Sequence, residues 1–94
     1  MKRQYNTRHI GEILQEKLDE LEMTQKKLAE LTNLPSPMIS EYMTGKRKVS
    51  PKSCIAIGLV LDISPYELGR MQSDYLIAQA FKVVIEKTKE SVNY

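Results

Sequence analysis

The sequence predicts an all-α protein of five helices, the last of them long. Apolar residues recur at helical spacing along the chain, and signals for a helix start appear several times. No segment alternates polar and apolar residues as a half-buried strand does. With 94 residues, 41% of them hydrophobic, the chain can enclose one modest core. We therefore expect a single domain over residues 1–94.

The first two helices are predicted from an apolar face and from a capping residue. The apolar face of the first helix repeats every three, four and seven to eight residues, and it consists of Ile10, Ile13, Leu14, Leu18 and Leu21. Thr24 can accept a hydrogen bond as the N-cap of a second, short helix. That helix is expected to end near Thr32-Asn33.

The third helix is expected to start within residues 34–37. There Ser36 offers a capping oxygen, and proline suits the first helical position. We expect this helix to run to Met43 and to stop at Gly45, because glycine adopts the left-handed conformation that ends many helices.

Serine followed by proline marks two further helix starts, at Ser50 and at Ser64. The helix over residues 51–61 is apolar nearly all round, with Gly58 permitting close backbone approach. Burial between the third and fifth helices would explain this apolar character, and so would a surface that meets a partner. The last helix is expected to run unbroken from Pro65 to about residue 90.

Residues 24–44 have the spacing of a helix-turn-helix. A small side chain at Ala29 lets two helices cross closely, and Asn33 is a residue type that accepts a positive φ in the turn. The apolar positions that would fill the wedge between these helices and the first one are Leu28, Leu34, Ile39 and Tyr42. An ordinary corner between helices would show a similar pattern by chance.

Basic charge is concentrated in the middle third of the chain. Between Met23 and Ser53 only two acids, Glu30 and Glu41, stand against six basic residues, which are Lys26, Lys27, Lys46, Arg47, Lys48 and Lys52. The loop over residues 46–49 directly follows the expected recognition helix, where phosphates flank the DNA groove. A solvated surface loop is the alternative interpretation. A nucleic-acid contact is therefore expected in this segment.

Several other functions are disfavoured by the composition. Cys54 is the only cysteine and His9 the only histidine, so no multi-cysteine metal site and no catalytic cluster is expected. Cys54 is expected to be a small buried hydrophobe, and His9 a capping or surface residue. We predict neither an enzyme nor a cofactor. No apolar run follows the N-terminal charges, and the stretch over residues 54–61 is too short to span a bilayer, which indicates a cytoplasmic protein.

From His9 to Phe81 the sequence resembles the Xre-type helix-turn-helix superfamily of phage repressors and Cro, and within it the HigA-type antitoxins. Three stretches carry the resemblance: His9-Ile10-Gly11-Glu12-Ile13-Leu14, then Thr44-Gly45-Lys46-Arg47 before Ser50-Pro51, and Met71-Gln72-Ser73-Asp74-Tyr75-Leu76. The resemblance implies a five-helix, lambda-repressor-like domain. It also implies a homodimer that represses its own operon and associates with a HigB-like, mRNA-cleaving toxin.

The DNA contacts are expected from three parts of the chain. Side chains of the third helix would face the major groove, namely Ser36, Met38, Ser40 and Glu41, with Pro37 fixing the helix start. Glu41 would read a cytosine amino group or point away, because phosphates repel a carboxylate. The resemblance implies a phosphate contact for Gln25, next to its cap Thr24. The basic residues Lys46, Arg47 and Lys48 would hold the DNA backbone.

The long last helix is the expected dimer element, since one module makes too few contacts for tight, specific binding. It carries two apolar stripes, of which one can pack on the protein's own core while the other needs a partner. The candidate interface residues are Met71, Tyr75, Ile77, Phe81 and Val84.

Two rival functions remain open. One is a protein-interaction module that neutralises a toxin but binds DNA poorly, as Glu41 and the sparse positive charge on the recognition helix would suggest. The other is a solitary Xre-type regulator without a toxin. A toxin gene of about a hundred codons next to this one would favour the antitoxin, and its absence would favour the solitary regulator.

Overall fold

The computed structural model describes residues 8–91, with side chains described as far as residue 87. The N-terminal charges before residue 8 lie outside this part. The described chain forms five helices and no strand: α1 Ile10–Glu20, α2 Gln25–Thr32, α3 Ser36–Thr44, α4 Pro51–Leu61 and α5 Pro65–Ser91. The all-α class and the long last helix are thus confirmed.

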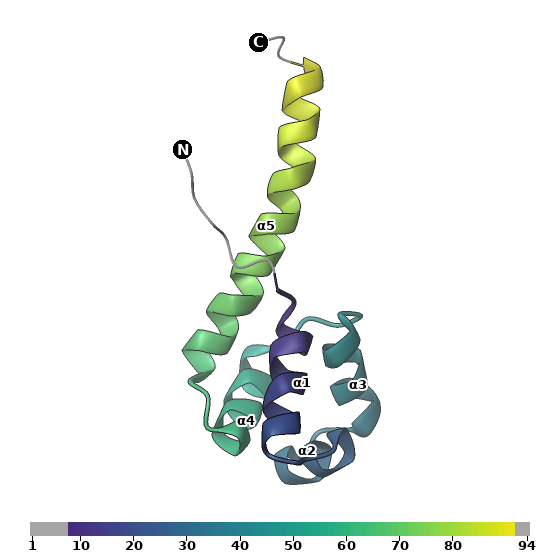
Figure 1. Ribbon diagram of the computed structural model, residues 1–94, viewed down its shortest axis with the longest axis vertical. Coiled ribbons are helices and arrows are strands. Elements are labelled where there is room, and N and C mark those ends of the chain that lie inside the picture. Colours follow the sequence, from purple (N-terminus) through teal and green to yellow (C-terminus); the bar gives the residue numbers. More distant parts are fainter. Residues whose placement is uncertain (1–7, 92–94) are drawn as a thin grey trace.

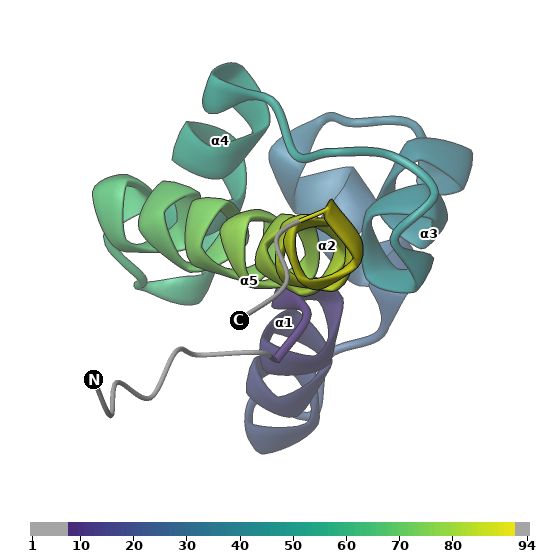
Figure 2. The same ribbon diagram turned by 90° about the horizontal axis from the view of Figure 1, so that it is seen from above.

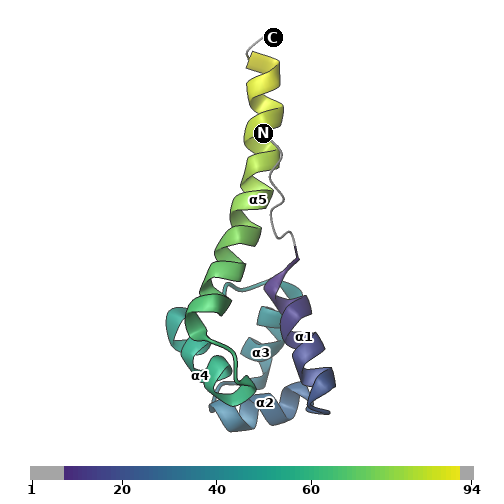
Figure 3. The ribbon, with the colours of Figure 1, turned by 60° about the vertical axis from the view of Figure 1, so that its left-hand side comes forward.

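Helices α1 to α4 form a body from which α5 projects (Figures 1 and 3). The first half of α5 packs on α4 and α1, and its second half continues beyond the body. The molecule consequently measures 53 Å along its longest axis and 25 and 21 Å along the others. Seen from above, α3 and α4 lie on opposite sides of the body (Figure 2). Helix α3 packs on α1 and α2.

The core lies where α1, α2 and α3 meet α4 and the start of α5. Its largest fully buried side chains are Ile10, Leu14, Leu18, Leu28, Ile39, Ile57, Leu61 and Leu68. The expected wedge of the helix-turn-helix is confirmed, because Ala29 and Tyr42 are also buried and Leu34 packs against the cluster. The Tyr42 hydroxyl shares a 2.7 Å hydrogen bond with Ser53 Oγ, which links α3 to α4.

Cys54 is a buried free cysteine, as expected. Burial raises the pKa of its thiol, since a thiolate loses hydration in an apolar environment.

The predicted helix ends are largely confirmed. Thr24 Oγ1 accepts a hydrogen bond from the Lys27 N–H at 3.0 Å, and Ser50 Oγ accepts one from the Ser53 N–H at 3.2 Å. Asn33 ends α2 in the left-handed region with a φ of 59°. These groups satisfy backbone donors and acceptors that a helix end leaves open.

Helix α3 starts within residues 34–37 as predicted, but its cap differs from the prediction. Its N-cap is Pro35 and not Ser36, and Ser36 is the first helical residue. The carbonyl oxygen of Pro35 accepts from the N–H groups of Met38 and Ile39 at 3.0 and 3.1 Å. Pro37 has no N–H to satisfy, so this turn needs no side-chain cap. The Ser36 hydroxyl therefore remains available on the surface.

Helix α4 packs mainly on α2 and α5, and the Tyr42–Ser53 hydrogen bond also joins it to α3. The expected burial between the third and fifth helices is therefore confirmed, with α2 as a further neighbour. Two of its apolar side chains stay exposed, Ile55 at 51% and Leu59 at 76%. A Cβ on Gly58 would overlap the main-chain oxygen of Ile63, so the expected close approach is confirmed at the turn into α5.

Candidate nucleic-acid interface

The outer side of α3 faces solvent. Ile39 and Tyr42 point into the core and are at most 2% exposed. Met38, a predicted contact residue, is half-buried and packs against the core. The exposed side chains of the helix are Ser36, Pro37, Ser40 and Thr44. This face is therefore small and hydroxyl-rich, and Thr44 joins it although the sequence interpretation omitted this residue.

Glu41 lies on α3 between the outer face and the loop that follows. Its Oε1 accepts a hydrogen bond from Arg47 Nε at 2.8 Å. This hydrogen bond and the charge of the carboxylate raise the pKa of the Arg47 guanidinium. The negative charge that seemed out of place next to DNA is therefore paired with a cation of the basic loop.

The basic loop over residues 46–49 begins directly at the end of α3. Gly45 ends the helix with a φ of 84°, and its N–H donates to the Glu41 carbonyl oxygen. The three basic side chains that follow are exposed: Lys46, Arg47 and Lys48. The structure thus brings these cations to one end of the exposed α3 face.

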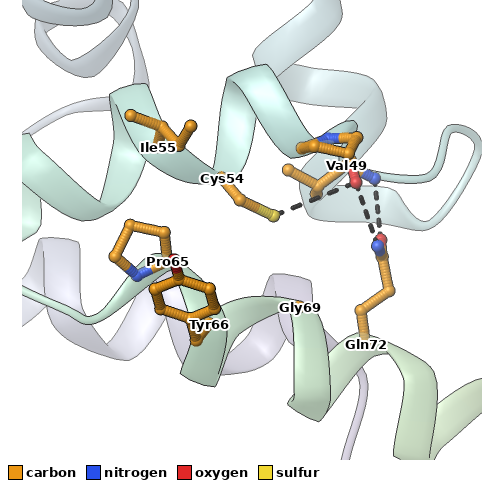
Figure 4. Close-up of a pocket in the computed structure, with 8 residues that line it drawn as sticks. Val49, Cys54, Ile55, Pro65, Tyr66, Gly69 and Gln72 are labelled. Atoms are coloured by element: carbon orange, nitrogen blue, oxygen red, sulfur yellow. Dashed lines mark hydrogen bonds between the residues drawn. The ribbon is translucent and has the colours of Figure 1, made fainter.

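The far end of the basic loop is held by α5. Gln72 Oε1 accepts from the Val49 N–H at 2.7 Å, and Gln72 Nε2 donates to the Val49 carbonyl oxygen at 3.0 Å (Figure 4). One amide side chain thereby satisfies both backbone groups of a buried residue. Gln72 was not among the predicted site residues, because nothing in the sequence pairs it with Val49, which lies 23 positions earlier.

Thr24 and Gln25 lie at the N-terminus of α2, on the same side as the end of α3. Gln25 Nε2 donates to Gln15 Oε1 on α1 at 3.2 Å. Gln25 and Thr44 line one hollow of about 460 Å³ between α1 and α3. Gln25, the residue predicted to bind a phosphate, therefore lies beside α3, and α1 orients its amide group.

The only histidine has a structural role. His9 Nδ1 accepts from the Gly11 N–H at 2.9 Å and caps α1, as expected. Its ring meets Tyr75 edge-on, with the ring centroids 5.1 Å apart. Within residues 8–87 no group of histidine, cysteine and acidic side chains could hold a metal ion.

The candidate dimer residues fall into two sets along α5. Met71 packs against the core and Tyr75 contacts His9, so the half-buried first set lies on the protein's own body. The second set lies on the projecting half, where Ile77 is 51%, Phe81 45% and Val84 60% exposed. Together with Ala80 they line an apolar hollow of about 280 Å³.

A second apolar surface lies between α4 and α5 (Figure 4). Its groove has a volume of about 580 Å³ and is lined mainly by apolar side chains, among them Ile55, Pro65 and Tyr66. Tyr66 is 91% exposed.

None of the helices in the described part of the chain has the length and apolar character required to cross a membrane.

Comparisons with known proteins agree with a helix-turn-helix in this chain. A helix-turn-helix family model matches residues 14–68. An uncharacterized HTH-type transcriptional regulator of Escherichia coli K12, YddM, is 31% identical over 74 residues, which is 79% of each chain.

Two solved structures share nearly the whole fold at 25% sequence identity. An addiction module antidote protein of the HigA family from Coxiella burnetii superposes with a TM-score of 0.82 over 94% of this chain and 97% of its own. The Pseudomonas aeruginosa antitoxin HigA, solved with the higBA promoter, gives a TM-score of 0.81 over 93% and 96%. The chain therefore belongs to the Xre-type helix-turn-helix family and shares its fold with HigA-type antitoxins.

Proposed function

We propose that this protein is a sequence-specific DNA-binding repressor that acts on its own promoter region as a HigA-type antitoxin. The observation that carries the proposal is the exposed hydroxyl-rich face of α3 with the basic loop at its end. A relative at 25% identity, the Pseudomonas aeruginosa antitoxin HigA, was solved with its promoter. The activity is binding and requires no catalytic group.

In this proposal each part of the interface has a separate task. Ser36 and Ser40 hydrogen-bond to base edges in the major groove, because a hydroxyl can both donate and accept. Pro37 sets the first turn of α3, and the exposed part of Met38 touches a thymine methyl group. Gln25 binds a phosphate at the N-terminus of α2, beside its cap Thr24.

The loop cations supply the contacts that do not depend on sequence. Lys46, Arg47 and Lys48 are exposed, and neither lysine forms an ion pair with a described acidic residue. Each phosphate that such a cation neutralises contributes about one unit to the slope of log affinity against log salt concentration. Binding is therefore expected to weaken steeply as salt is added.

A titration of labelled duplexes tests this proposal. The protein is titrated against the region upstream of its own gene and against a scrambled duplex, at several salt concentrations. Tighter binding to its own region is expected, and Arg47→Ala should weaken binding to both duplexes and lower the salt slope by about one unit for each protomer bound. Lys82→Ala, which removes an exposed cation on the projecting part of α5, is the matched control. Equal, feeble binding to both duplexes would contradict the proposal.

A homodimer belongs to the same proposal, because two modules on half-sites give the affinity that one lacks. Its support is the exposed apolar set on the projecting half of α5, Ile77, Phe81 and Val84. Sedimentation equilibrium should give a dimer for the wild type and a monomer for Val84→Glu. Gln79→Glu introduces the same charge at an exposed polar position and should stay dimeric. A wild-type monomer at all concentrations would refute this part.

A second candidate function is toxin binding by a chain that contacts DNA weakly. The exposed apolar groove between α4 and α5 favours it, because contiguous apolar surface marks protein contacts. Coexpression with the product of the adjacent gene tests it: a stable complex with a HigB-like toxin supports the antitoxin, with or without DNA binding. If the adjacent gene encodes no such toxin, the solitary regulator is favoured instead.

A further inference from the structure

One residue of α3 holds the start of the basic loop in two ways. The main-chain oxygen of Glu41 accepts from the N–H groups of Lys46 and Arg47 at 3.0 and 3.3 Å. Its side-chain Oε1 accepts from Arg47 Nε at 2.8 Å. The backbone of the loop and the side chain of its arginine are therefore both tied to the last turn of the helix that faces the groove.

The geometry of the side-chain contact leaves the rest of the guanidinium available. Arginine presents its N–H donors in a planar fork, and the Glu41 bond occupies the one on Nε. Each terminal nitrogen keeps one N–H that is directed away from the side-chain stem, and the bond from Nε uses neither of these two donors. They match the bidentate geometry with which arginine binds phosphate.

The contribution of this pair to folding is expected to be small. The side chains of Arg47 and Glu41 are 51% and 39% exposed, and exposed ion pairs contribute little to stability. A free arginine side chain, however, loses much rotamer freedom when it is fixed on a ligand. A carboxylate that already holds the side chain lowers this cost of binding.

We propose that Glu41 is a positioning residue: its carboxylate holds Arg47 Nε so that the terminal nitrogens of the guanidinium are directed at a DNA phosphate. In this role Glu41 does not read a base. The inference rests on the proposed DNA-binding function of the basic loop.

Two substitutions at position 41 separate positioning from simple repulsion. If Glu41 only repels phosphates, both Glu41→Ala and Glu41→Gln should bind DNA more tightly than the wild type. If it positions Arg47, Glu41→Ala should bind about fivefold more weakly although a negative charge has been removed. Glu41→Gln keeps an acceptor oxygen for Arg47 Nε and should recover most of this loss. The main-chain bonds of residue 41 persist in both variants.

The experiment is a double-mutant cycle with Arg47→Ala, measured on the upstream duplex and on the scrambled duplex. In the Arg47→Ala background Glu41→Ala should no longer weaken binding, and the cycle should therefore give a positive coupling at both duplexes. Thermal unfolding should show nearly equal midpoints for wild type and Glu41→Ala.

Two failures can be told apart. If Arg47→Ala weakens binding but Glu41→Ala strengthens it, the positioning role is wrong while the proposed function stands. If Arg47→Ala leaves binding to every duplex unchanged, the proposed phosphate contact is wrong and the positioning role falls with it.

Discussion

Replacing Gln72 by alanine tests how strongly α5 holds the basic loop. The substitution removes both hydrogen bonds to Val49, which is only 3% exposed. A typical intramolecular hydrogen bond contributes about 1 kcal/mol net, so the loss of two costs about 2 kcal/mol. For a domain of this size 1 kcal/mol shifts the melting temperature by about 4–8 °C. We therefore expect Gln72→Ala to melt roughly 10 °C below the wild type.

The assay is thermal unfolding followed by circular dichroism at a fixed protein concentration, because dimerisation would make the midpoint concentration-dependent. Gln79→Ala is the matched control, since it removes an exposed glutamine from the same helix. The control should stay close to the wild type or rise slightly, because alanine is a strong helix former. A Gln72→Ala midpoint equal to that of the control would refute the structural role assigned to Gln72.

Three further predictions concern stability. Gly58→Ala should lower the free energy of unfolding by about 1–3 kcal/mol in urea titrations, because the new Cβ overlaps the Ile63 oxygen. Gly69→Ala should raise it by up to about 1 kcal/mol, because its Cβ meets open space. Thr24→Ala should cost about 1 kcal/mol in the same assay, because α2 loses its N-cap. The pKa of buried Cys54 is raised above its ordinary value of 9.0, so the folded state retains this proton longer than the unfolded state. The stability from this group is therefore present below a pH of about 9 and lost as the pH rises through the raised pKa, a decline that Cys54→Ala should reduce. The glycine and Thr24 predictions are wrong if the variants unfold with the same free energy as the wild type. The cysteine prediction is wrong if the stability of Cys54→Ala falls with rising pH as much as that of the wild type.

The sequence predicted the parts of the fold that local chemistry determines. Thr24, Asn33 and Gly45 mark helix ends because each suits one backbone conformation or cap, and all three are found in those roles. The spacing of buried residues in α2 and α3 likewise predicted which faces turn inward. The cap of α3 was not predicted correctly, because the helix begins at Ser36 after the N-cap Pro35 and has no side-chain cap.

The interface was less predictable, because its organisation depends on long-range contacts. Charge alone suggested that Glu41 opposes DNA binding, and only the fold brings its carboxylate to Arg47. The role of Gln72 needs the packing of α5 beside the loop, which local sequence does not encode. For the same reason the sequence could not tell which of the two apolar stripes of α5 packs on the protein's own body, and the structure places Met71 and Tyr75 there.

The central claim, that the outer face of α3 reads DNA bases while the basic loop holds the backbone, is tested most directly by comparing Ser40→Ala with Lys48→Ala. Binding of each variant is measured on the upstream duplex and on a scrambled duplex. We expect Ser40→Ala to weaken binding to the upstream duplex alone, and Lys48→Ala to weaken binding to both about equally. If neither Ser40→Ala nor Ser36→Ala changes the preference for the upstream duplex, α3 is not the helix that reads the bases.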